Sequence, residues 1–348
     1  MSETLRIGVL GLSHDHAWGN LEDLKQTEGV QLAAAADDHP QLLEKIRAAH
    51  GCATYDDDVA MLDQERLDAV FIFADNAGGE KLFTEAAVRG LPAMVEKPMA
   101  HSLAGAEAML ATARRHDVRL MINWPFAWWP QMQHALTVVQ RGDVGRLWQV
   151  KYRAAHAGPK ELGCSEYFCD WLFDASRNGG GAMIDYCCYG ALLARVFLGV
   201  PSRVTGVSGR LVKEDILVED NGILVMSYPG AMAISEGSWS QIGNLSSYIT
   251  MIHGTRGTLM MEPRVGGRLL LADDAHPDGA PLDVPDPPAS MRSATAHFVH
   301  CLKTGEPFMP LCDDRHGRDA QEILEAGLHA AESGMEVSLP LPQSRRHS

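Results

Sequence analysis

A lysine follows a short apolar run, residues 91–95, in the sequence Glu96-Lys97-Pro98. Such a run is typical of a buried strand, and open α/β sheets bind their ligands at the carboxyl ends of their strands. Alternation along the strand sends Glu96 and Lys97 to opposite sides, so Lys97 can point into a cleft while Glu96 braces the loop. Taken alone, these residues fit a solvated ion pair as well as they fit a ligand site.

A second candidate group is the stretch Gly179–Gly181 with Asp185 and Tyr189 behind it. On a helix, residues four apart share one face, so a carboxylate and a phenol would lie side by side. That is equipment for general acid–base catalysis, and a nearby ammonium group would lower the pKa of the phenol from about 10. The spacing alone favours a simpler interpretation, an apolar helix with one buried, hydrogen-bonded aspartate.

The turn after the first apolar run has part of a dinucleotide-binding pattern. Starting at Gly11, the pattern G-x-G-x-x-G meets Ser13 and His16 where glycines are expected. Ser13 is still small enough for the backbone to approach a pyrophosphate at a helix N-terminus. Asp37 ends the next apolar run, where a carboxylate can bind a ribose 2′-hydroxyl and repel a 2′-phosphate, so it favours NAD over NADP. Asp37 can also cap the helix that follows it.

Further polar residues stand at predicted strand ends. Ala74, Asp75 and Asn76 close the strand predicted at 68–74 and should lie over the cofactor cleft. His14 and His16 form a His-x-His pair, but the sequence shows no companion carboxylate cluster, so we predict no metal site. We expect His14 to contact the cofactor or the substrate.

Aromatic residues gather near residue 124. Trp124, Phe126, Trp128 and Trp129 lie within six positions, and Trp171 follows later. This is more than a core needs at one junction, and such faces commonly pack against sugar rings or line an apolar pocket. We therefore expect Trp124, Trp128 and Trp171 to contact the substrate.

Alternating elements must position these residues. Strands are predicted at 5–11, 30–36, 68–74, 92–95 and 118–122, and helices at 15–26, 40–50, 79–89 and 102–116. This alternation predicts a Rossmann-type parallel sheet with helices on both faces, over a domain of residues 1–123.

The pattern changes in residues 124–348, which we predict to be an α+β substrate-binding and oligomerisation domain. Strands are expected at 147–153, 202–212, 221–228, 231–239, 247–253 and 257–262, and helices at 131–140, from the turn at 178–181 to 198, at 290–304 and at 315–333. Such closely spaced strands predict an open, mostly antiparallel sheet. Residues 272–289 are predicted to be an exposed loop.

Composition indicates an ordinary globular protein. The 348 residues are 46% hydrophobic and 22% charged, with a net charge of −15 and no long basic run, which argues against nucleic acid and anionic membranes as partners. No run of about 18 apolar residues is evident, so no membrane span is predicted. The start of the chain lacks a basic signal-peptide region, and the seven cysteines lack a C-x-x-C pair, so we expect a cytoplasmic protein with reduced thiols.

Together these motifs resemble the Gfo/Idh/MocA family, the group of glucose–fructose oxidoreductase, inositol dehydrogenase and dihydrodiol dehydrogenase. The resemblance spans nearly the whole chain. It rests on Glu96-Lys97-Pro98 and Gly179-Gly180-Gly181-x-x-x-Asp185, supported by Ala36-Asp37, Asn76, Gly254-Thr255-x-Gly257-Thr258 and Val337-Ser338-Leu339-Pro340.

The resemblance implies a fold and a reaction. It implies a Rossmann domain, a second domain whose sheet often forms a homodimer or homotetramer contact, and hydride transfer between a nicotinamide and a secondary alcohol. Lys97 matches the family lysine that contacts substrate and nicotinamide, and Asp185 matches the family aspartate. Tyr189 stands where most members have histidine, although some branches carry tyrosine, and Ala127 stands where many have arginine.

We therefore predict an NAD(P)-dependent dehydrogenase or reductase acting on a sugar, cyclitol or related polyol. Tyr189 would exchange the hydroxyl proton, Lys97 would orient the substrate oxygen, and Asp185 would help to position the substrate. The predicted cofactor is NAD, held by Gly11, Ser13, His14, Asp37, Ala74, Asp75, Asn76, Glu96 and Lys97. The predicted substrate contacts are His14, Trp124, Trp128, Trp171 and Tyr189.

Two other functions fit the same residues. One is an NAD-dependent glycosidase or lyase with no net redox change. The other is a non-catalytic dinucleotide-binding sensor, which the altered glycine turn and Ala127 would suit. A small molecule is the expected partner in each case.

Overall fold

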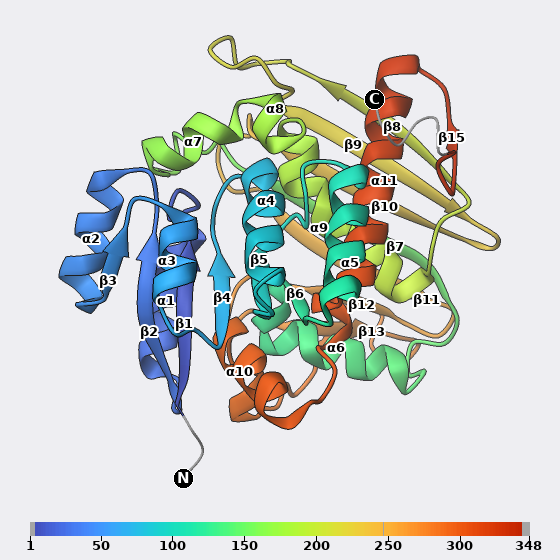
Figure 1. The fold of residues 1–348 in the computed structure, drawn as a ribbon. Coiled ribbons are helices and arrows are strands. Elements are labelled where there is room, and N and C mark those ends of the chain that lie inside the picture. Colours follow the sequence, from blue (N-terminus) through green and yellow to red (C-terminus); the bar gives the residue numbers. More distant parts are fainter. Residues whose placement is uncertain (1–3, 246, 343–348) are drawn as a thin grey trace.

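The computed structural model describes residues 4–245 and 247–342, in which two sheets stand side by side (Figure 1). The first sheet has six parallel strands in the order β3-β2-β1-β4-β5-β6, which is the Rossmann order. Its strands are β1 Leu5–Leu10, β2 Val30–Ala36, β3 Ala53–Tyr55, β4 Ala69–Ile72, β5 Ala93–Glu96 and β6 Leu120–Asn123. Its helices are α1 His16–Gln26, α2 Pro40–His50, α3 Asp58–Gln64, α4 Asn76–Ala87 and α5 Leu103–His116.

The predicted Rossmann architecture is confirmed, with two differences. Strand β3 and helix α3 were not predicted, because a three-residue strand and a seven-residue helix are too short to show a period. Helix α4 begins at Asn76 rather than at Gly79, since the Asp75 carboxylate accepts a hydrogen bond from Gly78 N at 2.7 Å and caps the first turn.

The second sheet has nine strands in the order β14-β13-β12-β11-β7-β10-β9-β8-β15. Its pairs are antiparallel except β7–β10, which is parallel, so the predicted open and mostly antiparallel sheet is confirmed. Its strands are β7 Leu147–Ala155, β8 Arg203–Gly209, β9 Asn221–Tyr228, β10 Ala231–Ser238, β11 Tyr248–Gly254, β12 Thr258–Met261, β13 Leu269–Ala272, β14 Ala280–Pro281 and β15 Val337–Ser338. The loop predicted at 272–289 is wrong in part, because β14 lies within it and pairs with β13.

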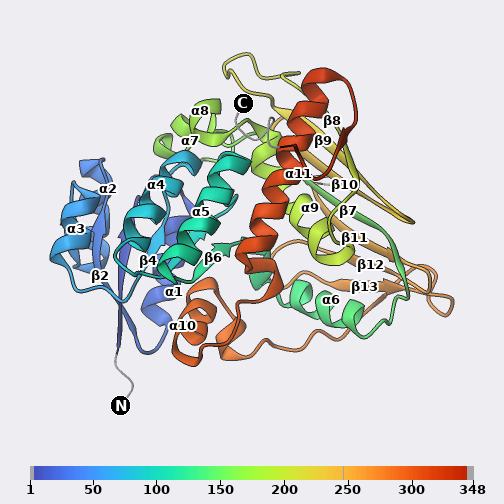
Figure 2. The same ribbon diagram turned by 45° about the vertical axis from the view of Figure 1, so that its right-hand side comes forward.

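Helices cover one face of this sheet (Figure 2). The long helix α9, Ala182–Leu198, packs against β7, β9 and β10, and α11, Asp314–Ser333, packs over α9 and β8. The other elements of this half are η1 Pro125–Trp128, α6 Pro130–Gln140, α7 Glu166–Leu172, α8 Ala175–Asn178, η2 Ala289–Met291, α10 Ala294–Thr304 and η3 Pro310–Cys312.

One described stretch, Ala175–Leu198, is long and apolar enough to cross a membrane, although no such run was predicted. It comprises α8, the glycine turn and α9. Of its apolar 18-residue segment, 72% is buried inside the protein. Packing between the sheet and α11 therefore accounts for its composition.

The end of the chain returns to the first sheet. Helix α10 packs beside α1, and Phe298 lies edge-on to Phe71 of β4 with ring centroids 5.7 Å apart. Helix α11 packs against α5 as well as against α9. The two sheets are thus joined by one continuous apolar core that contains residues of both domains.

Candidate active site

A cavity of about 430 Å³ lies at the carboxyl edge of the Rossmann sheet. Gly11 has φ +77°, and a Cβ on it would stand 2.9 Å from the nitrogen of Ala74, so the turn after β1 can pass β4 only as glycine. Acidic groups dominate the wall. The lining includes Gly11, Ser13, Asp37, Asp38, Asp56, Asp57, Asp58, Ala74, Asp75, Lys81 and Arg177.

Asp37, predicted to bind a ribose hydroxyl, follows β2 and lines this cavity. One carboxylate oxygen accepts a hydrogen bond from Leu12 N at 2.6 Å, and the other faces the backbone and the ring of His39 at 2.7 and 2.8 Å. Burial raises the pKa of Asp37, although these donors oppose the shift. Two carboxylate oxygens offer about four acceptor positions, so room remains for a ribose hydroxyl.

Helix α7 lies over this cleft and ties the second domain to it. Ser165 donates to the Asp15 carboxylate through its backbone N–H at 2.8 Å and its hydroxyl at 2.6 Å. The Tyr167 ring lies edge-on to His39, and the Phe168 ring edge-on to His14. The cleft is therefore a site shared by both domains.

Lys97 and Asp185 meet across the domain boundary, although 88 residues separate them. Lys97 Nζ donates to Asp185 Oδ1 at 2.6 Å, and the two side chains are only 4% and 9% exposed. Trp239 Nε1 donates to the other carboxylate oxygen at 3.2 Å. Tyr189 completes the group, with Lys97 Nζ 5.1 Å from its ring centroid. The structure thus brings the three predicted catalytic residues together.

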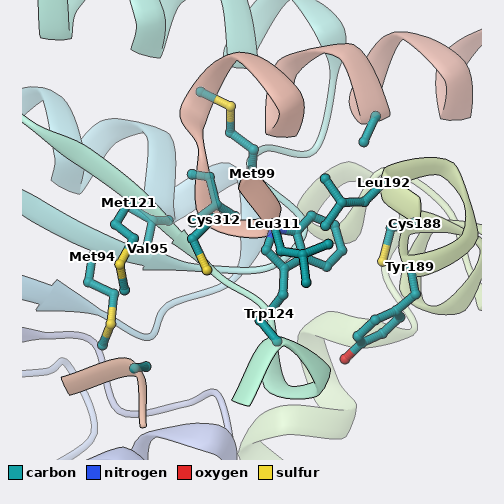
Figure 3. Packing of buried hydrophobic residues seen from close by; sticks show 14 of the residues in the cluster. Met94, Val95, Met99, Met121, Trp124, Cys188, Tyr189, Leu192, Leu311 and Cys312 are labelled. Atoms are coloured by element: carbon teal, nitrogen blue, oxygen red, sulfur yellow. The ribbon is translucent and has the colours of Figure 1, made fainter. Parts of the chain in front are cut away.

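The expected lowering of the Tyr189 pKa is wrong. Burial raises it well above 10, and Cys188, Glu96 and Asp185 nearby add to the shift. Lys97 lies over the ring face and its ammonium is paired with Asp185, so it does not offset the loss of water. Figure 3 shows the phenol projecting from α9 beside Trp124. Tyr189 is therefore a protonated donor at neutral pH.

Two further polar residues adjoin this group and were missed from the sequence. His156, which directly follows β7, has Nε2 2.7 Å from the hydroxyl of Tyr186, and its Nδ1 accepts a hydrogen bond from Gly158 N at 2.9 Å. The Tyr186 ring stacks on that of Tyr189 with centroids 6.3 Å apart. Burial raises the pKa of Tyr186 and lowers that of His156, so both are neutral near pH 7. The available signal was a histidine three residues beyond the strand predicted at 147–153.

Two residues predicted to bind cofactor face the second domain. The Asn76 amide donates to Asn178 at 2.8 and 3.0 Å, and the Asp75 carboxylate pairs with Arg177 at 2.9 Å. Asp75 and Ala74 also line the cleft. These contacts hold the two domains in register at the cleft.

The three predicted substrate tryptophans lie in different surroundings. Trp124 and Trp171 are each 1% exposed, and their indole N–H groups have no partner among the described residues. Trp171 stands 5.5 Å from the His14 ring, and Trp124 stands 5.5 Å from Tyr189. Trp128 instead donates to Asn123 Oδ1 at 2.9 Å. Trp124 and Trp171 thus border the site with donors still free, whereas Trp128 braces it.

Glu96 supplies the carboxylate that the His-x-His pair lacked in sequence. Ligand atoms of His14, His16 and Glu96 all lie within 4.8 Å of one another. However, His14 Nδ1 accepts a hydrogen bond from His16 N at 3.2 Å, and His16 Nδ1 lies 3.0 Å from Glu96 Oε1. These contacts already engage Nδ1 of both rings and one oxygen of Glu96, and we assign no metal to the cluster.

Two stretches of the chain match known families. Residues 5–124 match the oxidoreductase family with an NAD-binding Rossmann fold, and residues 132–260 match the GFO/IDH/MocA C-terminal domain.

Several curated enzymes are similar along most of the chain. D-apiose dehydrogenase of Paraburkholderia graminis is 26% identical over 95% of this chain and 88% of its own length. D-apiose dehydrogenase of Rhizobium rhizogenes is 30% identical over 73% of this chain and 71% of its own length. The D-xylose 1-dehydrogenase of Haloarcula marismortui, which is named for NADP(+), is 26% identical over 78% of this chain and 74% of its own length.

A solved structure of similar fold is aldose–aldose oxidoreductase from Caulobacter crescentus, complexed with glycerol. It superposes with a TM-score of 0.83 over 97% of this chain and all of that one, at 24% identity. The likeness establishes the common fold.

Proposed function

We propose a function from the premise that this chain belongs to the Gfo/Idh/MocA family of oxidoreductases, whose two domains it matches in order. It is an NAD(P)-dependent oxidoreductase related to sugar dehydrogenases. Within that class, we infer that it transfers hydride between NAD and a CH–OH group of an uncharged aldose.

The observation that carries this proposal is the Lys97–Asp185 pair. It places a permanently charged donor directly after β5, at the sheet edge that also carries the cleft, and against the second domain. Asp185 raises the pKa of Lys97 against the effect of burial, so the ammonium keeps its charge. Such a group stabilises negative charge that develops on a substrate oxygen as its proton leaves.

The neighbouring residues take supporting roles. Tyr189, protonated because its pKa is raised, donates a hydrogen bond to the substrate oxygen. Asp185 has both oxygens engaged by Lys97 and Trp239, so it acts by holding Lys97 in place. A nicotinamide dinucleotide bound in the cleft would supply the hydride acceptor.

The acidic cleft favours NAD over NADP. Asp37, Asp38 and the run Asp56–Asp58 line the end where the ribose would lie, and Arg177 is already paired with Asp75 and Asp170. A 2′-phosphate would meet like charge there. Fluorescence titration should show NADH binding at least about tenfold tighter than NADPH, and Asp37→Ser should narrow the gap. Equal affinities would contradict this assignment.

The activity is tested on a panel of D-apiose, D-xylose, D-glucose and myo-inositol with NAD+. We expect NADH to form with at least one aldose, and Lys97→Met to lower kcat by roughly 100-fold or more while NADH still binds. Glycosides of these aldoses are assayed in parallel, and their conversion without net NADH would favour the glycosidase or lyase alternative. Tight NADH binding without turnover would favour the sensor.

A further inference from the structure

His16 and Glu96 form a hydrogen-bonded pair at the carboxyl edge of the Rossmann sheet. His16 begins α1 and Glu96 ends β5, and His16 Nδ1 lies 3.0 Å from Glu96 Oε1. The other carboxylate oxygen accepts a hydrogen bond from Asn123 Nδ2 at 2.8 Å, and Trp128 Nε1 fixes Asn123 in turn. An ionised carboxylate can only accept, so the His16 ring proton lies on Nδ1.

This tautomer leaves a lone pair on His16 Nε2. The Glu96 side chain is 3% exposed and the His16 side chain 39%, so a buried carboxylate orients an imidazole that remains accessible. Hydrolase triads use the same relation, in which a carboxylate holds Nδ1–H and stabilises the imidazolium that forms when Nε2 takes a proton.

Lys97, Tyr189 and His14 lack such a lone pair. His39 has the same relation to Asp37, with its Nδ1 2.8 Å from the carboxylate, but it stands at the end of the cleft where the ribose would lie. Lys97 is held charged by Asp185, and the raised pKa of Tyr189 keeps it protonated. His14 is neutral because burial, His16 and Lys97 lower its pKa, but its Nδ1 accepts the His16 N–H, so its proton is on Nε2.

His16 also lies near the candidate catalytic residues. Its ring centroid is 4.6 Å from that of His14. The His14 ring packs against Trp171, and the charge of Lys97 contributes to lowering the pKa of His14. The Glu96 and Lys97 side chains leave adjacent positions at the end of β5 towards opposite sides. His14 therefore connects the imidazole with the ammonium across this strand end.

We propose that His16, oriented by Glu96, is the proton acceptor for alcohol oxidation and the proton donor in the reverse direction. This inference rests on the proposed function. The substrate O–H proton passes to His16 Nε2, the C–H hydrogen leaves with its electron pair to NAD+, and a C=O bond forms. The products are the carbonyl compound, NADH and an imidazolium that releases its proton to water.

The first test is chemical rescue of turnover with D-apiose, D-xylose or D-glucose and NAD+. His16→Ala should lower kcat by roughly 100-fold or more, and added imidazole should raise the kcat of the variant by at least about tenfold. Glu96→Gln should lose at least about tenfold, with no restoration by imidazole. The control is His276→Ala, because His276 has a similar Nδ1–carboxylate contact with Asp273 at 3.2 Å on an exposed loop. It should keep full activity.

The second test needs no substrate. Diethylpyrocarbonate labelling mapped by mass spectrometry should modify His16 faster than His14, and NADH should protect His16. Protection without turnover on any aldose would support the placement of His16 and contradict the proposed substrate class.

Three results would overturn the inference. These are His16 labelling that NADH does not slow, a His16→Ala enzyme that keeps more than a third of kcat, and a rate loss that imidazole does not reverse. Stoichiometric zinc in the purified protein, lost in His16→Ala, would also overturn it by making the ring a metal ligand.

Discussion

Lys97 and Asp185 illustrate how much depends on a single buried pair. Neither side chain is more than 9% exposed, so each charge is tolerated only because the other is present. The same pair joins the two domains, which links stability to activity.

Removing one partner should therefore be costly. Lys97→Met leaves the Asp185 carboxylate buried and unpaired, so we expect the free energy of unfolding to fall by about 3–5 kcal/mol, measured by urea denaturation. The double variant Lys97→Met/Asp185→Asn should lose less than the sum of the single variants. The control is Lys160→Met, which breaks an exposed pair with Asp215 and should cost under about 1 kcal/mol. Equal losses for the buried and the exposed pair would contradict this account.

His297 should make stability depend on pH. It is 4% exposed, its Nε2 accepts a hydrogen bond from Met309 N at 2.9 Å, and burial lowers its pKa to about 4. Because the ordinary pKa of about 6.5 is higher, the unfolded chain takes the proton first as pH falls. The neutral ring therefore contributes stability above about pH 6.5, which is lost towards pH 4.

Between pH 7.5 and pH 5 this group should cost about 2 kcal/mol of unfolding free energy. His297→Gln keeps an acceptor without a titrating ring, so its stability should fall less over the same interval. Urea unfolding of both proteins at the two pH values measures the difference. Parallel pH profiles would show that His297 does not titrate on unfolding.

Only some site residues could be predicted from the sequence. Lys97 and Asp185 were found because strand ends and helix spacing are local patterns. The His16–Glu96 contact joins residues 80 positions apart, and no local pattern reports it. The Tyr189 pKa was predicted in the wrong direction because burial among aromatic rings, rather than sequence spacing, decides it.

Among the elements, α9 is positioned by the glycines that precede it, and the Glu219 carboxylate accepts hydrogen bonds from Gly181 N and Met183 N at its first turn. A Cβ on Gly179 would lie 2.2 Å from the carbonyl oxygen of His101, and one on Gly181 would lie 2.1 Å from that of Glu219. The backbone of the turn therefore packs directly against the backbone at His101 and at Glu219. This contact sets where α9 begins, and so where Asp185 stands.

Gly181→Ala should disturb that placement. We expect a loss of about 1–3 kcal/mol in unfolding free energy and a lower kcat, since the first turn of α9 must shift. Gly19→Ala in α1 is the matched control, because a Cβ there meets nothing within 4 Å. It should gain about 0.5–1 kcal/mol from helix propensity. Urea denaturation measures both, and a neutral Gly181→Ala would show that the turn can relax.

Long elements could be predicted because their apolar period repeats. Strand β9 was predicted at its observed bounds, and α2 likewise. Missed elements such as β3, α3, α7 and β13 are three to seven residues long, and their positions depend on tertiary contacts. Helix α7 in particular is fixed by its contacts over the cleft.

For the whole molecule, the asymmetry of the second sheet is the main feature. Helices α9 and α11 cover one face (Figure 2), and the side chains pointing there from β9 and β10, such as Leu224 and Ala233, are fully buried. Alternation sends their neighbours to the opposite face. Apolar residues there are 37–67% exposed: Val207, Ile223, Val225 and Met232.

This exposed apolar face should be the contact of a homodimer or homotetramer, because contiguous apolar patches on a protein surface commonly mark interfaces. Light scattering coupled to size exclusion should give a mass of two or four chains. Val207→Lys/Val225→Lys puts two charges into the patch and should shift the protein to a monomer at micromolar concentration. Val88→Lys is the control, because Val88 is 50% exposed at the end of α4 in the Rossmann domain, and it should leave the mass unchanged. A monomeric wild-type protein would contradict the predicted assembly. A charged double variant that still assembles would show that the contact lies on another surface.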